Sequence, residues 1–453
     1  AAPVRRMQLR RWLVPGIGVK RWLVLVFLGL VVLALGVAHF IRQFDQGVAH
    51  GTLAQQVIDV VTLQFLPYPL RGFLAALTGV AGVAIGAWGA ARALTDPLRA
   101  SPGGEDQPLV EVIYQKRFLA RGPKVVAIGG GTGLSTLLRG MKEHTSNLTA
   151  IVTVADDGGS SGALREELGI PPVGDIRNCI AALADTEPLM ADLLGYRFPG
   201  GRLVDGRMVE TEPGGLGGHA VGNLLLAALT ALQDGDFEEA VRRMNRVLAV
   251  RGQVLPASPT PITLHARTVD GVVVTGQSEV TKTRGIERAW IAPGDVHASS
   301  DALAAIDAAE IIVLGPGSLY TSVLPVLLLP EIRDAVAASS AIRLYVSNVA
   351  MQAGETDGLD LADHVEALLA HTRAGLVDVV LANDRLDLAS GGPGAVALRW
   401  PPATAPVPHL ATDDVVDPTA PHHHEPARLA EAILRACERE AAAVRRERVA
   451  RSA

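Results

Sequence analysis

The stretch KVVAIGGGTGLSTLLRG at residues 124–140, followed by TAIVTVADDGGSSG at residues 149–162, decides the fold of this chain. Its apolar run ends in a glycine-rich turn and an amphipathic segment, which predicts a strand, a turn and a helix. Backbone N–H groups in such a turn can face an anion because glycine has no Cβ, and the helix dipole adds to the attraction. The second run ends in Asp156 and Asp157. The two loops therefore predict a nucleotide or phosphorylated-metabolite site.

The composition limits the classes of protein to which the chain can belong. Its 453 residues suffice for one large domain or two ordinary ones with appendages. The formal net charge is −6 and the expected globular part has no long basic stripe, which argues against nucleic acid as a partner. Cys179 and Cys437 give neither a disulfide framework nor zinc-ligand spacing. These features indicate that the globular part occupies a reducing compartment.

Two apolar stretches near the N-terminus predict a transmembrane helical hairpin. Residues 23–40 and 73–90 each comprise 18 residues without Asp, Glu, Lys or Arg. As helices they would be roughly 27 Å long, close to the thickness of a bilayer core. Basic residues precede the first stretch and follow the second, so the positive-inside rule places both ends in the cytoplasm. Four glycines would let the helices approach closely: Gly79, Gly82, Gly86 and Gly89.

The hairpin interpretation has one alternative for each stretch. The first stretch also fits a cleaved signal peptide, although its apolar run is long and a second span follows. The second is rich in Gly and Ala and also fits a buried core helix. We expect a multi-pass protein of the inner cell membrane with its globular domain in the cytoplasm.

Five short apolar runs predict an α/β fold with a Rossmann-like, mostly parallel sheet and helices on both faces. The runs are Val125–Ile128, Ala150–Val154, Ile311–Leu314, Ile342–Val346 and Val377–Leu381. Between the second and third runs we expect an insertion-like region. It would contain helices over 175–183, 220–232 and 237–248, and a hairpin of 263–268 with 272–275 that turns at Asp270-Gly271.

The predicted organisation has six parts. They are a basic cytoplasmic tail (1–21), two transmembrane helices with a short external link (22–91), a linker (92–123), a nucleotide-binding or nucleotide-sugar-binding α/β domain (124–385), a Pro-, Gly- and His-rich loop (386–424) and a C-terminal helix (425–453). Within the loop, the run His422–His424 is interpreted as solvated rather than as a metal site, because nothing else with metal-ligand spacing lies beside it.

Polar and glycine-rich segments follow the predicted strands and supply the candidate site. Open α/β sheets bind ligands outside the carboxyl ends of their strands, so we expect these segments to meet at one edge of the sheet. The candidate ligand-binding residues are Gly130, Gly131, Thr132, Gly133, Asp156, Asp157, Asn178, His219, Asn223, Gly315, Gly317, Ser318, Tyr320, Thr321 and Asn348.

Several of these residues admit more than one role. Asp156 and Asp157 are the candidates for catalysis and for metal binding, since adjacent carboxylates can hold Mg²⁺, accept from ribose hydroxyls or act as a base. Tyr320 either stacks on a base or packs in the core. The GGGTG turn lacks both the last glycine of the dinucleotide fingerprint and the lysine of a P-loop, which disfavours an NAD(P)-dependent dehydrogenase.

Six motifs, in this order, resemble those of the family of the bacterial gluconeogenesis factor YvcK: GGGTGLSTLLRG, ADDGGSSG, GDIRN, GHAVGN, GPGSLYTS and SNVAMQAGETDG. The resemblance spans roughly residues 124–385, and that family is related to 2-phospho-L-lactate transferase. In the bacterial branch it implies binding of UDP-N-acetylglucosamine and a role in cell shape, cell-wall supply and gluconeogenic growth. In the transferase branch it implies Mg²⁺-dependent transfer of a phospholactyl group from a guanosine-linked donor to a deazaflavin precursor.

From the motifs and this resemblance we expect a membrane-tethered, cytoplasm-facing regulatory protein that binds a UDP-sugar, with the phospholactyl-type transferase as the alternative. GGGTG and GPGS would hold the diphosphate, and Tyr320 and Thr321 would contact the base or sugar. No cofactor is certain, and Mg²⁺ is the ion that the paired aspartates suggest. The expected partners are a nucleotide sugar or nucleotide-linked metabolite, the membrane through the two N-terminal helices, a second copy of the chain, and cell-wall synthesis proteins.

Overall fold

The computed structural model of the chain describes residues 19–41, 73–74, 77–89, 119–184, 187–199, 202–204, 207–209, 216–389, 396–399 and 408–452. The chain divides into two compact units, Ala1–Ala120 and Arg121–Ala453. The predicted basic tail up to residue 18, the external link and the linker up to residue 118 lie outside the described residues.

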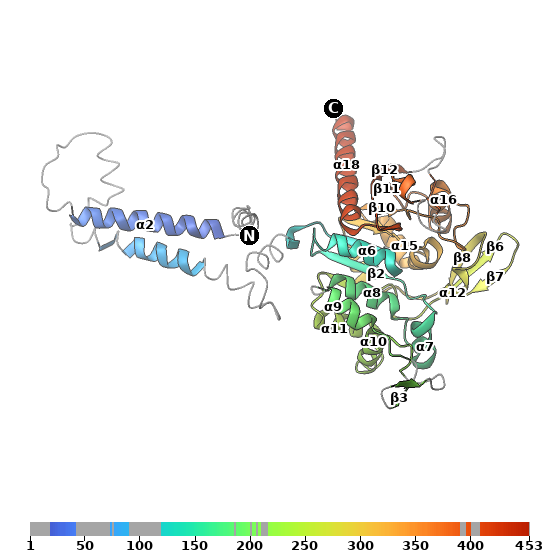
Figure 1. The fold of residues 1–453 in the computed structure, drawn as a ribbon. Coiled ribbons are helices and arrows are strands. Elements are labelled where there is room, and N and C mark those ends of the chain that lie inside the picture. Colours follow the sequence, from blue (N-terminus) through green and yellow to red (C-terminus); the bar gives the residue numbers. More distant parts are fainter. Residues whose placement is uncertain are drawn as a thin grey trace. The chain divides into compact units, whose positions relative to one another are not determined.

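The described part of the N-terminal unit contains two helical segments that pack through glycines (Figure 1). They are α2 (Val19–Ile41) and a helical segment at residues 77–89. A Cβ on Gly29 would lie 2.8 Å from the backbone nitrogen of Val83, and one on Gly79 would lie 2.8 Å from that of Leu33. The expected close approach of these helices through glycine is therefore confirmed.

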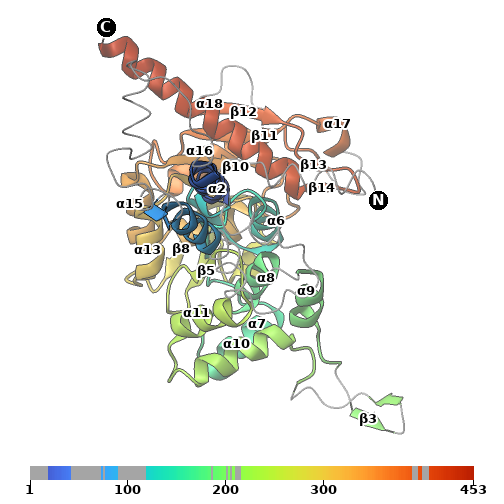
Figure 2. The same ribbon diagram turned by 90° about the vertical axis from the view of Figure 1, so that its left-hand side faces the viewer.

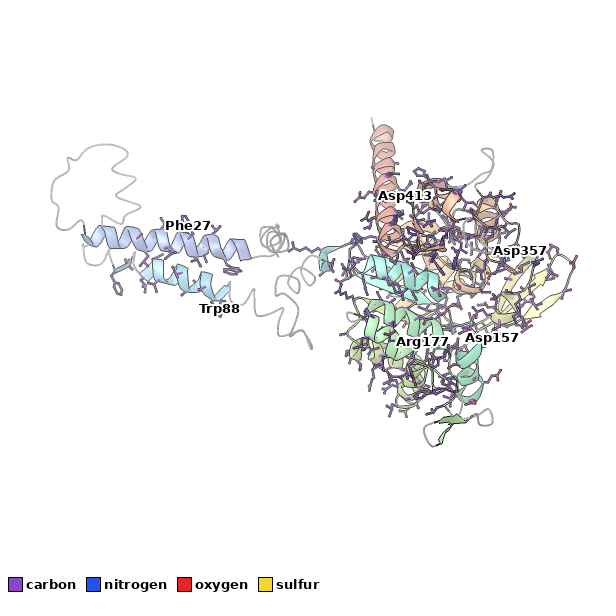
Figure 3. The ribbon with its side chains drawn as sticks, in the orientation of Figure 1. Phe27, Trp88, Asp157, Arg177, Asp357 and Asp413 are labelled. Atoms are coloured by element: carbon purple, nitrogen blue, oxygen red, sulfur yellow. The ribbon has the colours of Figure 1, made fainter. Side chains whose placement is uncertain are left out.

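The predicted transmembrane hairpin is not confirmed. Within the ranges that the structure describes, no helix is both long enough and apolar enough to cross a membrane. Both helical segments do expose large apolar side chains, among them Phe27 and Trp88 (Figure 3).

The second unit is built on a seven-stranded sheet in which every neighbouring pair is parallel (Figure 1). Its strands, in spatial order, are β12 (His409–Asp413), β11 (Val379–Asn383), β10 (Ile342–Val346), β9 (Ile311–Leu314), β1 (Val125–Gly129), β2 (Leu148–Val152) and β5 (Gln253–Pro256). β1, β2, β9 and β11 are buried along their whole length, which explains their apolar sequences. The expected parallel α/β sheet is confirmed, and β5 and β12 are two further strands.

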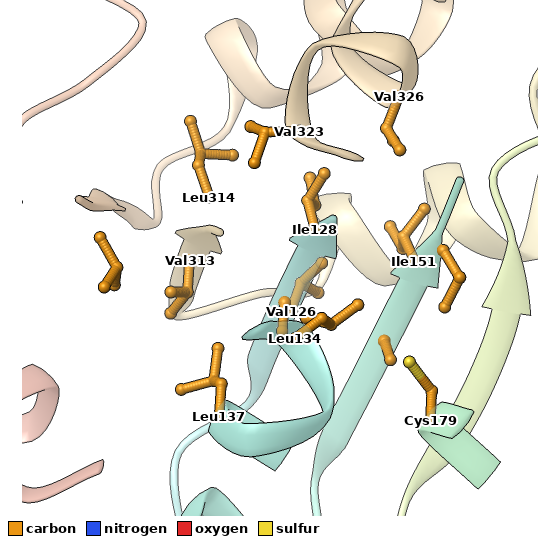
Figure 4. Close-up of a cluster of buried hydrophobic side chains, with 14 of the residues drawn as sticks. Val126, Ile128, Leu134, Leu137, Ile151, Cys179, Val313, Leu314, Val323 and Val326 are labelled. Carbon is orange, nitrogen blue, oxygen red and sulfur yellow. The ribbon is translucent and has the colours of Figure 1, made fainter. Parts of the chain in front are cut away.

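Helices cover both faces of this sheet (Figure 2). On one face lie α6 (Gly131–Met141), α8 (Gly174–Leu183) and α18 (Pro426–Ser452). On the other lie α13 (Ser300–Asp307) and α14 (Leu324–Leu327), with α15 (Pro330–Ala338) packed against them and α16 (Leu361–His371) in the β10–β11 crossover. Side chains of β1, β2, β9, α6 and α8 interlock in the core between these layers (Figure 4).

The insertion between β2 and β9 contains further helices and two small sheets. The helices are α7 (Gly159–Leu168), α9 (Glu187–Gly195), α10 (Val221–Ala231), α11 (Phe237–Val247) and α12 (Gln277–Val280). The small sheets are β3 (Arg202–Val204) with β4 (Arg207–Val209), and β6 (Thr263–Thr268) between β7 (Val273–Thr275) and β8 (Ile286–Ala292). The expected hairpin is present, with Gly271 at φ +82° and its N–H donating to the carbonyl of Thr268.

The segment 386–424, expected to be loop, contains regular structure. It holds α17 (Leu386–Ala389), β12, β13 (Val416–Asp417) and β14 (Ala420–His424). β12 extends the sheet by pairing with β11, and β14 pairs with β13. The sequence of β14, APHHH, has little intrinsic strand propensity, so its conformation comes from tertiary pairing rather than from local preference.

Gly140 marks the place where the start of α18 meets α6. A Cβ at this position would collide with the carbonyl oxygen of Pro426. We expect Gly140→Ala to destabilise the second unit by about 1–3 kcal/mol, because the two helices would have to move apart. Thermal or urea unfolding measures the change. Gly294→Ala is the matched control, since a Cβ there meets nothing within 4 Å, and equal stability of the two variants would contradict this packing.

Candidate functional site

The strand order of the sheet changes direction between β1 and β9. From β1 the chain adds β2 and β5 on one side, and from β9 it adds β10, β11 and β12 on the other. Ligands of open α/β sheets bind at such a switch point, beyond the carboxyl ends of the strands. The GGGTG turn follows β1 and the GPGS turn follows β9, so both glycine-rich turns lie at the switch point on one edge of the sheet.

The two glycine-rich turns are in contact. A Cβ on Gly133 would lie 2.5 Å from the carbonyl oxygen of Pro316, so no other residue fits at this position without a shift. Gly131, the first residue of α6, has φ +64°, a conformation that side chains with a Cβ rarely adopt. The glycines therefore bring two backbone segments together at the N-terminus of a helix.

A cavity of about 320 Å³ opens between these turns. Seven predicted ligand-binding residues line it: Gly130, Gly131, Thr132, Gly133, Gly317, Ser318 and Asn348. Asn348 accepts from the N–H of Gly317 at 3.3 Å, and Ser318 donates to the side-chain oxygen of Gln352 at 2.6 Å. The loop after β10 thus holds the second glycine turn in place. Sequence reasoning missed the contribution of Gln352.

Three consecutive histidines at the end of β14 form another wall of the cavity. His422, His423 and His424 line it; His422 and His423 are exposed, as expected of a solvated run, whereas His424 is buried and the run belongs to a strand rather than to a loop. The His422 and His423 rings are 4.2 Å apart between centroids. His424 is 7% exposed, and burial lowers its pKa to about 4. Its Nε2 has no hydrogen-bond partner within the described part of the chain.

Asp175 contacts the first glycine turn and holds it in place. Its carboxylate accepts from the backbone N–H of Gly131, and a Cβ on Gly130 would lie 2.5 Å from its Oδ2. Burial, reinforced by the neighbouring charge of Asp156, raises the pKa of Asp175 to about 6. Asp175 was not among the predicted site residues. The GDIRN motif that contains it was the available signal.

Tyr320 and Thr321 do not line the cavity. Both are buried, and the buried carboxylate of Glu355 accepts from their backbone N–H groups at 2.6 Å and 3.1 Å. The Tyr320 hydroxyl donates to the carbonyl of Ile286, and its ring meets that of His371 edge to face. Of the two roles considered for Tyr320, the structure therefore places the side chain in the core, and neither residue lines the cavity in which the base or sugar is expected.

Asp156 and Asp157 are engaged within the protein. Asp157 Oδ1 accepts from the backbone N–H and the hydroxyl of Ser278 at 2.9 Å and 2.7 Å, which fixes the start of α12. Asp156 accepts from the N–H of Gly158 at 3.0 Å, and burial raises its pKa. Neither lines the cavity. Among the described residues no group of three or more His, Cys, Asp or Glu could hold a metal ion.

The remaining candidates form a separate polar network that joins α7, α8 and α10. His219 Nδ1 and Asn223 Nδ2 each lie 3.0 Å from the Ser160 hydroxyl. Arg177 donates to the side-chain oxygens of Asn223 at 2.9 Å and Asn178 at 2.8 Å (Figure 3 labels Arg177). None of these residues lines the cavity at the switch point. Gly315 also stays outside it, at the end of β9, where its N–H donates to the carbonyl of Ile128.

The sheet order and the cavity between two glycine turns define a Rossmann-like α/β protein with its candidate ligand site at the topological switch point. Residues 125–390 match the family described as 2-phospho-L-lactate transferase CofD. The gluconeogenesis factor of Bacillus subtilis is 48% identical over 262 residues, which cover 58% of this chain and 78% of the relative. That of Halalkalibacterium halodurans is 49% identical over 260 residues, 57% of this chain and 77% of the relative. The chain belongs to the gluconeogenesis factor family and carries a CofD-like domain.

A solved structure shows the same fold. The crystal structure of a UPF0052 family protein from Bacillus halodurans superposes with a TM-score of 0.62 at 43% sequence identity. The match covers 69% of this chain and 99% of that protein. The expected relationship to the gluconeogenesis factor family is thus confirmed by sequence and by structure.

Burial of His424 predicts a pH dependence of stability. Its pKa is about 4 in the folded chain against the ordinary histidine value of 6.5, so between these values the unfolded chain binds a proton that the folded chain does not. This costs the wild type up to about 3 kcal/mol as the pH falls from 6.5 to 4. We expect His424→Gln to lose that term, so that the stability of the variant relative to wild type improves in this window. Urea unfolding at several pH values measures it, and a constant difference would contradict the assignment.

Proposed function

We propose that the cavity at the switch point binds a UDP-sugar of the UDP-N-acetylglucosamine type, and that the protein is a nucleotide-sugar-binding regulator of cell shape, cell-wall supply and gluconeogenic growth. The observation that carries the proposal is the contact between the two glycine turns, marked by Gly133 and Pro316. It supports a diphosphate site because it gathers backbone and hydroxyl groups of two strand ends around one cavity.

The chemistry of the cavity lining suits an anion with a polar attachment. In the first turn of α6 the N–H of Gly131 already donates to Asp175, but the other backbone N–H groups at this helix end and the positive end of the helix dipole can attract an anion. Thr132 and Asn348 add side-chain donors, whereas the Ser318 hydroxyl already donates to Gln352. The volume of about 320 Å³ lies at the lower end of the range for small-molecule sites, roughly 300–1,000 Å³. A diphosphate with part of its sugar or base would fill it, and the histidine wall would contact the rest.

The transferase is a second candidate, because the family match carries the description of 2-phospho-L-lactate transferase. An enzyme of that kind needs a surface for a planar deazaflavin acceptor. No Phe, Tyr or Trp lines the cavity among the described residues, and Asp156 and Asp157 are held by other contacts. These observations favour the binding protein over the enzyme.

Thermal unfolding of the whole chain with a panel of ligands tests the proposal. A ligand whose free concentration is about 100 times its Kd stabilises the folded state by about 2.7 kcal/mol. We expect UDP-N-acetylglucosamine to raise the melting temperature, and GDP and NADH to have little effect. A response to NADH alone, or to none of the three, would contradict the proposal. Turnover of a deazaflavin acceptor with a guanosine-linked donor would establish the second candidate.

Gly133→Ala tests the contact between the glycine turns directly. The added Cβ would stand 2.5 Å from the Pro316 carbonyl oxygen and push the turns apart. We expect the affinity for the UDP-sugar to fall at least ten-fold, measured by isothermal titration calorimetry. Gly294→Ala, which adds a methyl group in open space, is the control for unaltered affinity. Unchanged affinity of Gly133→Ala would remove the turns from the binding site.

A further inference from the structure

Helix α8 packs against α6 on one side and α9 on the other (Figures 1 and 2). A second, smaller cavity lies between these three helices. Its volume of about 150 Å³ has room for several water molecules or one phosphate-sized anion. Three residues at positions i, i+3 and i+7 of α6 line it, namely Thr132, Ser135 and Arg139. Thr132 also lines the cavity at the switch point, so the first turn of α6 stands between the two.

The charge of this smaller cavity has one sign. Arg139 from α6 and Arg177 from α8 line it, and none of its lining residues within the described part of the chain is acidic. The remaining wall includes small or apolar side chains, among them Ala181, Ala191 and Leu194. Polar side chains, among them Thr132 and Asn178, also line it, so an anion inside would meet side-chain donors as well as the two guanidinium groups.

The Arg177 side chain is held in a fixed orientation. Two of its N–H groups donate to the side-chain oxygens of Asn178 and Asn223, which are neutral acceptors. Burial lowers the pKa of Arg177, and the nearby charge of Arg197 lowers it further, whereas Asp175 and Asp156 oppose the shift. Arg177 is half-buried and its two side-chain acceptors are neutral, so an anion in the cavity would add a charge-assisted hydrogen-bond partner.

From this cavity, its two arginines and its shared residue Thr132, we propose that the protein has a second binding site, for a phosphate-sized oxyanion, next to the switch-point cavity. Binding of a free oxyanion at this site does not depend on the UDP-sugar assignment. Its oxyanion belongs either to a free small molecule or to an extension of the ligand bound in the first cavity, and the two sources share one chemistry, a phosphate or carboxylate group carried on a short apolar part.

Soaking crystals of the full chain in sodium tungstate locates the site. Tungstate has the shape and charge type of phosphate and scatters X-rays anomalously. We expect an anomalous peak between Arg139 and Arg177. A peak at the glycine turns alone, or none at all, would overturn the second site, and the first of these results would leave the UDP-sugar proposal standing.

Titration of the full chain with inorganic phosphate tests the two arginines. We expect Arg139→Gln and Arg177→Lys each to weaken binding at this site at least ten-fold, the second because lysine lacks the planar fork that binds oxyanions through two N–H groups. Arg246→Gln, on α11 and away from both cavities, is the matched control. Melting temperatures show that each variant is folded. Wild-type affinity of both folded variants would overturn the proposal.

The same variants separate the two sources of the anion. If the oxyanion is one phosphate of the diphosphate, which then reaches from the first cavity past Thr132 into the second, Arg139→Gln lowers the affinity for UDP-N-acetylglucosamine by the same factor as that for phosphate. If it belongs to a separate molecule, the affinity for the UDP-sugar stays at the wild-type value while phosphate binding is lost.

Discussion

Glycine at position 133 allows the backbone after β1 to touch the backbone after β9, and the candidate site depends on that contact. The two strands are neighbours in the sheet, yet the chain leaves them in opposite directions, so their loops would normally diverge. Without a Cβ at this point the loops meet instead, and the N-terminus of α6 forms the floor of a cavity with the second turn beside it. Geometry at a single residue thus converts a feature of sheet topology into a binding surface.

Buried acidic residues keep this arrangement rigid. Glu355 gathers two N–H groups and the Thr321 hydroxyl of the segment after the second turn, and Asp175 accepts from the first turn. Asp157 likewise accepts two hydrogen bonds from Ser278 and so holds the start of α12 in place. Burial raises the pKa of Glu355 to about 7, which is the cost of holding a carboxylate away from water. Sequence patterns often mark such acidic side chains as catalytic or metal-binding. Here they hold loops in place around a candidate site that is formed mainly by backbone groups.

The sequence predicted the parts of the fold whose signal is local. β1, β2, β9, β10 and β11 are short apolar runs, and sheet neighbours that bury both faces produce such runs. β14 was missed because its pairing with β13, not its own APHHH sequence, makes it a strand. The glycine turns were recognised, since glycine clusters have few other uses. The role of Asp157 was beyond reach, because its partner Ser278 lies 121 residues further along the chain.

The histidine wall has a consequence for biosynthesis. The first glycine turn lies near the start of the α/β unit and the second near its middle in chain order. His422–His424 come much later, just before α18. The cavity is therefore complete only after the ribosome has translated past His424 and β14 has paired with β13. A chain that ends before this histidine run contains every strand of the parallel sheet but lacks this wall. Binding of the proposed ligand would therefore distinguish finished domains from nascent or truncated ones.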